Sequence, residues 1–395
     1  MSGALKRDEW ETVRLGDVCS VVSGSTPKTA NPEYWDGDTL WITPAELNED
    51  SHYIYDTTRK ITEAGRNSAS LTLLPKGTVL LSSRAPIGKV GIVGTEMCCN
   101  QGFKNLVCSP VIFNNYLFWF LKGKTDYLNS LGRGATFKEI SKGIVANIKI
   151  PLPPLDVQRR IADTLDKVTG LITLRKTQLE KLDELVKARF VELFGNILCD
   201  SDLPLVQLKE LADIGSSKRI YANEYVESGV PFYRSKEIRE LGTGLKPSVE
   251  LFIKQERYDE IKAKYGVPKK GDILIAAIGA TIGYSWIVDT DKPFYYKDGN
   301  LIILSTKNTV NPIFLNHTMG ILIEDFKSKG VAGSAQLALT IGKLEKMMVI
   351  NPSIDLQNQF AAFVEQTDKS KSVIQQSLDT LETLKKSLMQ EYFGQ

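Results

Sequence analysis

The chain carries an internal duplication, and this feature limits its possible folds more than any other. "IPLPPLDVQRRI" at 150–161 is matched by "VINPSIDLQNQF" at 349–360, an offset of 199 residues (349 − 150). The same offset relates Gly134 with Gly333, Gly143 with Gly342, Pro153 with Pro352, Asp156 with Asp355, Gln158 with Gln357, Ala162 with Ala361, Leu185 with Leu384 and Phe194 with Phe393. Upstream, "VRLGDV" (13–18) faces "VQLKEL" (206–211), and "LPKGTVLLSSRAPIGKVGIV" (74–93) faces "VPKKGDILIAAIGATIGYSWIV" (267–288). Each half should therefore fold into a similar unit.

The first part of each half predicts a β-rich α+β domain. Short runs of strand-forming residues recur there, such as "GTVLLSS", "VGIVG" and "NLVCSPVIF" in the first copy and "GDILIAAI", "SWIVDT" and "NLIILST" in the second. Clusters of Gly, Pro, Asn and Asp separate these runs, as is typical of strands joined by turns and loops.

The second part of each half predicts one long helix. After Pro153 and Pro154, residues 156–193 contain no proline and a single glycine, and Gly195 stands where a helix C-cap belongs. Apolar residues recur there in steps of three and four, which indicates a heptad-like packing stripe. The stripe comprises Leu165, Val168, Ile172, Leu179, Leu182 and Val186 in the first helix and Val364, Ile374, Leu378, Leu381 and Leu388 in the second, where Thr367, Lys371 and Lys385 interrupt it.

Such a helix is longer than a small domain is wide, since about 38 residues at 1.5 Å each give roughly 57 Å. We therefore predict that the two helices pack on each other rather than each on its own domain. The expected fold class is α+β, with two similar β-rich domains joined by two long antiparallel coiled-coil helices and a pseudo-two-fold relation between the copies. The expected division is 1–151 for the first domain, 152–195 for the central helix, 196–350 for the second domain and 351–395 for the distal helix.

Composition excludes several classes of protein. No apolar run is long enough for a membrane helix, and the N-terminal residues have no signal-peptide pattern. Five cysteines, two of them adjacent, fit neither a disulfide framework nor the paired spacing of a zinc site, so we expect a reducing, cytoplasmic location. The formal net charge of +2 does not decide the partner, because basic residues can still gather on one face.

Several motifs, in order along the chain, resemble one known family. "PLPPLDVQRRIADTLDKV" and "LDELVKARFVELFG", with their second copies, are similar to the helical regions of the specificity subunit of type I restriction–modification enzymes. "VRLGDVCSVVSGSTPKTANPEYWDGDTLWITPAEL" (13–47) and "LPKGTVLLSSRAPIGKVGIV" resemble the target-recognition domain of that family. The second copy departs from this pattern, because 212–238 lacks the "STPKT" and "WITPAEL" motifs. A second domain that reads a different sequence would show such a difference.

The resemblance implies a non-catalytic DNA-recognition subunit of a methyltransferase/endonuclease complex. One recognition domain would read each half of a bipartite, asymmetric target in double-stranded DNA. The helices would set the spacer and bind two methyltransferase subunits, and restriction/translocase subunits could join. It implies no cofactor in this chain, with S-adenosylmethionine, ATP and Mg²⁺ used by the partners.

Candidate DNA-binding residues lie mostly in loops that follow predicted strands. In the first copy, "SGSTPKT" (23–29) can bring backbone N–H groups and a lysine to phosphates, and Arg84 can reach a base edge. Each also has a purely structural interpretation: the loop is then a surface turn, and the arginine forms a surface ion pair. The glycine-rich segments 132–141 and 330–340 are candidates too, but a flexible hinge between each domain and its long helix is the favoured interpretation of both. The first-copy candidates are Ser25, Thr26, Lys28, Arg84, Lys89, Arg133, Thr136 and Lys138.

In the second copy, "SSKRIY" (216–221) occupies the place of the first loop, and "PFYRSKEI" (231–238) forms another candidate patch. The second-copy candidates are Lys218, Arg219, Tyr221, Tyr233, Arg234, Lys236, Ser334 and Gln336. Trp35 and Trp41 are expected in the core. His52 and His317 have no ligand-spaced neighbours, so we expect structural or surface roles and no metal site.

Two rival functions stay open from the sequence. A stand-alone methyltransferase would need a cofactor fingerprint and an Asn-Pro-Pro-Tyr-type motif, and "NPEY" (31–34) has the wrong third residue. A scaffold whose two domains bind proteins would share the architecture. The salt dependence of binding distinguishes a scaffold from a DNA reader, because the affinity of contacts with DNA phosphates falls steeply as the salt concentration rises.

Overall fold

The computed structural model of the chain describes residues 10–84, 86–133, 138–199, 203–329 and 338–394. These residues form two compact units, each taking part of both long helices. Unit 1 comprises Met1–Thr177 and Gln375–Gln395, and unit 2 comprises Gln178–Ile374. The unit boundaries therefore fall within the helices. Among the described residues, no helix is long and apolar enough to cross a membrane.

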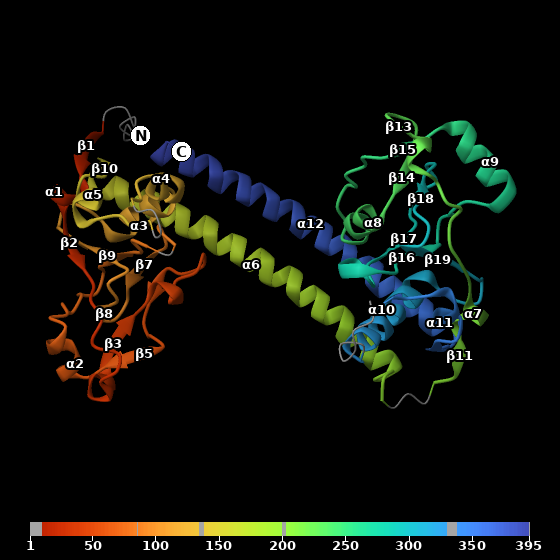
Figure 1. The fold of residues 1–395 in the computed structure, drawn as a ribbon, viewed down its shortest axis with the longest axis horizontal. Helices are drawn as coiled ribbons and strands as arrows, with labels where there is room; N and C mark the ends of the chain where they lie inside the picture. Colours follow the sequence, from red (N-terminus) through yellow and green to blue (C-terminus); the bar gives the residue numbers. More distant parts are fainter. Residues whose placement is uncertain (1–9, 85, 134–137, 200–202, 330–337, 395) are drawn as a thin grey trace. The chain divides into compact units, whose positions relative to one another are not determined.

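Unit 1 holds the first domain, which is a mixed α+β structure (Figure 1). Its elements are β1 (Glu11–Arg14), α1 (Leu15–Val18), β2 (Cys19–Ser23), β3 (Trp35–Ile42), β4 (Tyr53–Ile54), β5 (Arg59–Ile61), α2 (Glu63–Ser68), β6 (Val79–Leu81), β7 (Val90–Val93), β8 (Cys98–Cys99), β9 (Lys104–Cys108), α3 (Asn114–Lys122), α4 (Thr125–Ser130), α5 (Lys142–Ala146) and β10 (Lys149–Leu152). The strands form one sheet in the order β2-β9-β6-β7-β4, another in the order β5-β3-β8, and the pair β1-β10.

Unit 2 holds the second domain. Its elements are β11 (Leu205–Gln207), α7 (Leu208–Leu211), β12 (Ala212–Gly215), β13 (Tyr225–Val226), β14 (Val230–Tyr233), α8 (Ser235–Gly242), β15 (Phe252–Ile253), α9 (Gln255–Tyr265), β16 (Ile273–Ala276), β17 (Ser285–Ile287), β18 (Tyr295–Tyr296), β19 (Leu301–Thr306), α10 (Pro312–Lys329), α11 (Ile341–Glu345) and β20 (Met348–Ile350). The order β12-β19-β16-β17 reproduces β2-β9-β6-β7, and the parallel pair β14-β18 reproduces β3-β8. The duplication seen in the sequence is thus repeated in the topology.

The two long helices are α6 (Leu155–Phe194) and α12 (Ile354–Phe393), and each ends as the sequence predicts. The residues that follow them, Gly195 (φ 69°) and Gly394 (φ 61°), adopt the left-handed conformation of a helix C-cap. Within each unit the helices run antiparallel. In unit 1, Lys176 pairs with Glu382, and in unit 2 Lys371 pairs with Asp183 while Phe190 and Phe194 contact Phe360.

The predicted packing stripe faces inward on both helices. Leu165, Val168, Ile172 and Val186 of α6 and Val364 and Leu378 of α12 are buried, whereas Leu179, Leu182, Ile374, Leu381 and Leu388 are partly buried. The polar interruptions are accommodated locally. The Thr367 hydroxyl donates to the Phe363 carbonyl, Lys371 pairs with Asp183, and the Lys385 ammonium lies 5.0 Å from the centre of the Trp119 indole.

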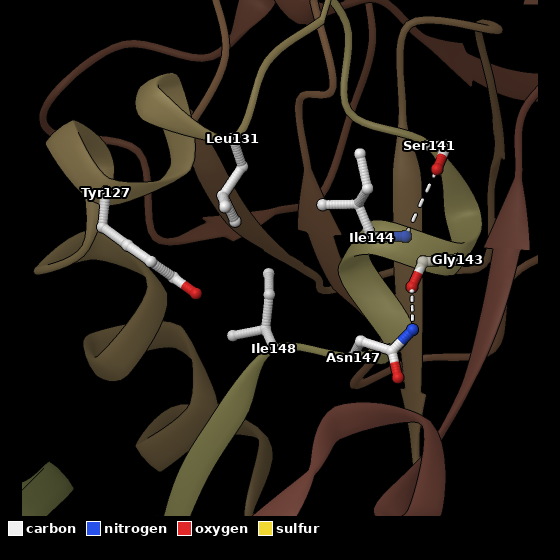
Figure 2. A pocket seen from close by; sticks show the side chains of 7 residues that line it. All are labelled: Tyr127, Leu131, Ser141, Gly143, Ile144, Asn147 and Ile148. Carbon is white, nitrogen blue, oxygen red and sulfur yellow. Dashed lines mark hydrogen bonds between the residues drawn. The ribbon is translucent and has the colours of Figure 1, made fainter.

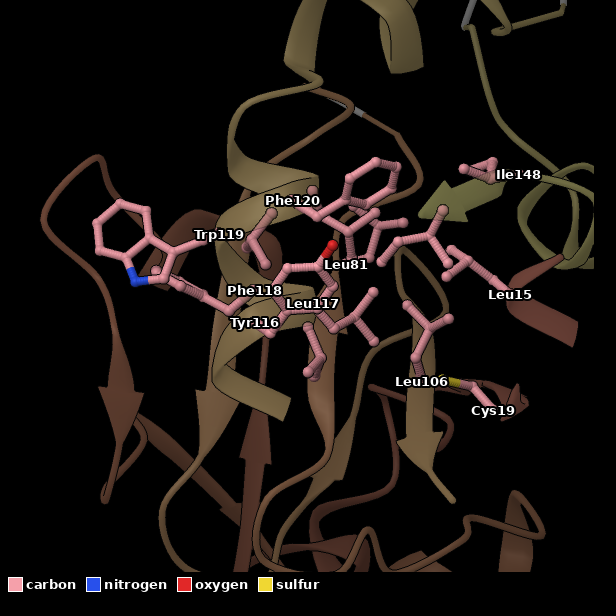
Figure 3. Close-up of a cluster of buried hydrophobic side chains, with 14 of the residues drawn as sticks. Leu15, Cys19, Leu81, Leu106, Tyr116, Leu117, Phe118, Trp119, Phe120 and Ile148 are labelled. Carbon is pink, nitrogen blue, oxygen red and sulfur yellow. The ribbon is translucent and has the colours of Figure 1, made fainter. Parts of the chain in front are cut away.

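The end of each helix completes the core of the domain encoded by the other copy. The unit 1 core gathers around α3, whose side chains face strand residues such as Leu81 and Leu106 (Figure 3). Phe393, from the end of α12, joins this core at 5.4 Å from Tyr116. Phe194, from the end of α6, lies 4.9 Å from Phe314 in the core of unit 2. Each unit therefore needs residues from both halves of the sequence.

Candidate nucleic-acid interface

Four segments of unit 1 that are distant in sequence meet at one end of the strands of the β2-β9-β6-β7 sheet, where β2 and β6 end and β9 begins. We call residues 24–28, 82–84, 99–102 and 138–140 loop edge 1. The Ser25 N–H donates to the Cys99 carbonyl at 3.0 Å, the Ser83 N–H to the Gly102 carbonyl at 2.7 Å and the Ile140 N–H to the Ser83 carbonyl at 3.0 Å. These backbone bonds fix the loops relative to one another, so side chains on them can be held in a defined pattern.

The first loop is held by close packing and by two tryptophans. A Cβ atom on Gly24 would lie 2.0 Å from the Asn100 carbonyl oxygen, so only glycine permits this approach. The Trp41 indole N–H donates to the Ser25 carbonyl at 3.1 Å, and the Trp35 indole N–H to the Lys28 carbonyl at 3.4 Å. Trp35 and Trp41 are buried, and the Arg59 guanidinium stacks 3.6 Å from the Trp35 ring centre. The two tryptophans thus support the loop from the core.

Side-chain hydrogen bonds link this loop to the turn at 100–102. The Gly102 N–H donates to Asn100 Oδ1 at 2.7 Å, and Asn100 Nδ2 donates to Thr26 Oγ1 at 3.0 Å. The Thr26 hydroxyl in turn donates to Gln101 Oε1. The Gln101 side chain is exposed.

The charged candidates of the first copy lie on loop edge 1 or beside it. The backbones of Arg84 and Arg133 both form bridges with Glu139, which brings the two arginines to the same place from separate segments. The Glu139 carboxylate accepts from Lys104 Nζ at 3.1 Å, so a nearly buried cation neutralises it. Lys89 Nζ donates to the Pro44 carbonyl at 3.1 Å. Lys28 and Lys138 are exposed, and Thr136 lies outside the described residues.

Unit 2 builds the same edge from equivalent backbone bonds. We call residues 215–219, 276–278, 298–300 and 338–339 loop edge 2. The Ala277 N–H donates to the Asn300 carbonyl at 2.8 Å, and the Leu339 N–H donates to the Ala277 carbonyl at 2.9 Å. Ser82, Ser83 and Arg84 of loop edge 1 are replaced by Ala276, Ala277 and Ile278. Backbone placement is therefore shared, and side-chain chemistry differs.

Basic and aromatic residues gather beside loop edge 2. Two adjoining hollows of about 580 and 540 Å³ share Lys218 and Tyr265 in their walls. The first is also lined by Arg219, Tyr221, Arg257 and Lys264. The Lys218 ammonium lies 4.3 Å from the Tyr265 ring centre, and the Tyr221 and Tyr265 side chains are largely exposed. Cations interleaved with exposed rings suit a sugar–phosphate backbone.

Arg219 is oriented by an acidic partner. Asp298 Oδ2 accepts from Arg219 Nε at 2.8 Å, and this hydrogen bond raises the pKa of the exposed guanidinium further above its ordinary value. Arg257 instead pairs with Glu224 and Glu260, which lowers its net contribution of positive charge.

The patch predicted at Tyr233, Arg234 and Lys236 has a different environment from the one expected. Tyr233 is buried and stacks 4.9 Å from Phe294, so its ring belongs to the core rather than to a DNA-facing surface. Arg234 pairs with the fully buried Glu237, and Glu250 accepts from both Arg234 and Lys236. These two bonds lower the pKa of the Glu250 carboxyl to about 2. The cations here are used within the fold.

The remaining residues considered from the sequence add nothing to loop edge 1 or loop edge 2 among the described residues. Ser334 and Gln336 lie outside the described residues. His52 Nε2 lies 2.6 Å from Asn115 Oδ1, and the ring stacks on Phe118 at 4.3 Å. Among the described residues, no group of three or more His, Cys, Asp and Glu side chains could hold a metal ion.

A further hollow of about 390 Å³ lies between α4, α5 and the start of β10 (Figure 2). Two of its polar side chains are engaged locally, because Ser141 caps α5 by accepting from the Ile144 N–H and Asn147 donates to the Gly143 carbonyl. None of the residues predicted to bind DNA lines this hollow.

Sequence reasoning missed Asn100, Gln101, Asp298, Lys264 and Tyr265. The repeat offered a signal for the turns, since "NQG" (100–102) and "DGN" (298–300) precede equivalent strands. Their contact with the first loop could not be read from the sequence, because it depends on the pairing of β2 with β9 and of β12 with β19.

The chain thus carries two copies of one domain, with equivalent backbone hydrogen bonds and different side chains at loop edge 1 and loop edge 2. A family model, the type I restriction modification DNA specificity domain, matches residues 7–184 and 201–383. The chain belongs to this family and carries two copies of its domain. The predicted resemblance is therefore confirmed, and the family consists of DNA-recognition rather than catalytic subunits.

Relatives with the same role match the chain over different lengths. The type I restriction enzyme MjaIX specificity subunit of Methanocaldococcus jannaschii is 32% identical over 67% of this chain, and that alignment covers only 59% of the relative. The MjaVIII specificity subunit of the same organism is 27% identical over 98% of this chain and 93% of the relative. The crystal structure of the S subunit of the type I restriction–modification system from M. genitalium matches with a TM-score of 0.63 and 16% identity, covering 99% of this chain and 98% of that one. The predicted fold class is thereby confirmed.

Proposed function

We propose that loop edge 1 and loop edge 2 each read one half of a bipartite, asymmetric target in double-stranded DNA. The observation that carries the proposal is the shared set of backbone hydrogen bonds, Ser83 to Gly102 in one unit and Ala277 to Asn300 in the other, beneath different side chains. Equivalent backbones can dock on DNA in the same way, whereas different side chains select different bases. The target halves should therefore differ in sequence.

The long helices are proposed to bind two methyltransferase subunits and to set the spacer between the half-sites. Exposed apolar residues at equivalent positions support two copies of one partner. Leu174 and Val373 are 60% and 68% exposed, and Leu185 and Leu384 are 49% and 44% exposed. Because the helices are antiparallel within each unit, unit 1 carries Leu174 and Leu384 and unit 2 carries Leu185 and Val373. Each unit thus offers the same pair of positions.

Catalysis is assigned to the partner subunits. In this proposal S-adenosylmethionine serves the methyltransferase subunits, and ATP and Mg²⁺ serve restriction/translocase subunits that can join the complex. A cytoplasmic location is part of this proposal, since the proposed DNA target and these cofactors are found there.

The test is a map of modified adenines. The chain is co-expressed with its cognate methyltransferase subunit in a host that lacks adenine methylation, and the genome is then read for modified positions. A motif with two fixed ends and a constant degenerate gap supports the proposal. Replacing residues 196–350 with the corresponding segment of a relative should change one end only. Methylation without this chain, or none from an assembled complex, would contradict DNA reading and favour a scaffold.

A further inference from the structure

We infer that Gln101 reads an adenine in one half of the target and that Arg219 reads a guanine in the other. This inference rests on the proposed function and deepens it by naming the base-reading groups. Thr26 and Arg219 occupy equivalent places, 193 residues apart, in the matched segments beginning at Val13 and Val206. Thr26 contacts residues 100 and 101 in the turn before β9, and Arg219 contacts Asp298 in the turn before β19.

The direction of hydrogen bonding around Gln101 is fixed from the backbone outward. The Gly102 N–H can only donate, so the Asn100 atom that it meets at 2.7 Å must be the carbonyl oxygen. Asn100 then presents its NH₂ group to Thr26 Oγ1 at 3.0 Å. The Thr26 hydroxyl donates its own proton to Gln101 Oε1.

This relay leaves Gln101 with a defined set of outward groups. Among the described residues none accepts from its NH₂ group, which keeps two donors, and Oε1 keeps one lone pair. One donor beside one acceptor matches N7 and the N6 amino group of adenine in the major groove, the pairing that Asn and Gln side chains make with that base. Because Gln101 is exposed and lies on a turn held by backbone bonds, little conformational freedom remains to be lost on binding.

The matched position in unit 2 presents a different pattern. The turn there is Asp298, Gly299 and Asn300, and Gly299 (φ 71°) has no side chain at the place of Gln101. Arg219 reaches this turn instead, and its side chain is 66% exposed whereas that of Asp298 is 16% exposed. Asp298 uses only the Nε–H, so both terminal NH₂ groups stay available. Paired donors of this kind match O6 and N7 of guanine.

The test uses the full chain with its methyltransferase partner and the genome-wide adenine map. Gln101→Ala should make one A·T position degenerate in one half-site, with discrimination there falling roughly tenfold or more. Arg219→Ala should do the same at one G·C position in the other half-site. Each variant is the matched control for the other, because Gln101→Ala removes an exposed side chain from loop edge 1 and Arg219→Ala removes one from the equivalent loop edge 2. Thr26→Val, which breaks the relay, should partly relax the same position as Gln101→Ala, whereas Thr26→Ser should not.

Several results would overturn the inference. These are an unchanged motif in both alanine variants, relaxation in the same half-site, relaxation at the other base type, or uniform loss of methylation by variants with a native melting temperature. If the unaltered chain gives no bipartite motif, the proposed function itself fails. The two failures are therefore distinguishable.

Discussion

Gln158 and Gln357 make two equivalent pairs of backbone hydrogen bonds in the two units. Gln158 Oε1 accepts from the Phe113 N–H at 2.7 Å, and its amide donates to the Pro153 carbonyl at 2.8 Å. Gln357 Oε1 accepts from the Asn311 N–H at 2.8 Å, and the Gln357 amide Nε2 donates to the Pro352 carbonyl at 2.9 Å. Both side chains are fully buried. Gln158 connects the start of α6 to the start of α3, and Gln357 connects the start of α12 to the start of α10. The repeated glutamine thus marks an internal joint rather than a binding site.

Removing either glutamine should weaken its own unit. Gln158→Ala leaves the part-buried Phe113 N–H and the buried Pro153 carbonyl without this partner, which costs about 1–3 kcal/mol. Hydrogen exchange should report faster opening in unit 1 for Gln158→Ala and in unit 2 for Gln357→Ala. Gln366→Ala, at an exposed position of α12, serves as the control and should change neither. Equal effects of Gln158→Ala on both units would contradict a local joint.

The aromatic ends of the helices should stabilise the domain of the other copy. Phe393→Ala removes a buried ring beside Tyr116 and Phe120 and should destabilise unit 1 by about 3–5 kcal/mol. The matching change Phe194→Ala should act on unit 2. Hydrogen exchange in α3 and α10 measures the two effects separately, with the exposed Gln390→Ala as control. Loss of protection in α10 from Phe393→Ala would argue against this exchange of helix ends.

Lengthening both helices together should widen the gap in the DNA target. Insertion of one heptad after Thr177 and another before Gln375 preserves the packing stripe and adds roughly 10 Å. Since base pairs are spaced by 3.4 Å, the degenerate gap in the methylated motif should grow by about three base pairs. The adenine map measures gap and half-sites together. Changed half-site sequences with an unchanged gap would show that the helices do not set the spacing.

Charge on the exposed apolar positions should remove one methyltransferase subunit at a time. Leu174→Glu with Leu384→Glu alters unit 1 only and should reduce the bound methyltransferase from two copies to one, as measured by native mass spectrometry. Leu185→Glu with Val373→Glu should do the same in unit 2. Thr173→Glu adds one negative charge at the exposed polar neighbour of Leu174 and should leave two copies bound. Two copies retained by either double variant would place the docking surface elsewhere.

Acidification should weaken unit 2 through His317. Burial lowers the pKa of this imidazole below 6.5, Lys371 adds to the effect and Asp368 opposes it. Because the unfolded chain takes up the proton at a higher pH than the folded chain, this stability is complete above about pH 6.5 and is lost as the pH falls below it. Denaturation of unit 2 measured between pH 7 and pH 5 should depend less on pH in His317→Gln than in the native chain. Identical slopes would exclude His317 as a contributor.

Local sequence signals were sufficient for the helices and for the repeated domains. Proline at the start, glycine after the end and apolar residues in steps of three and four predict α6 and α12 because these features act within a few residues along the chain. The strands at 79–81, 90–93 and 104–108 were predicted for the same reason. Tyr233 was misjudged because its neighbours Arg234 and Lys236 suggested a surface, whereas Phe294, distant in sequence, buries its ring.

The sequence by itself determined the duplication, the fold class, the inward stripe of the helices and the family. Only the tertiary structure decided that Phe393 completes unit 1 and that Thr26 orients Gln101 across 75 residues of chain. The physical reason is that propensity, capping and periodicity are local properties. The placement of a loop against a turn depends instead on strand pairing between distant segments, and no neighbouring residue encodes it.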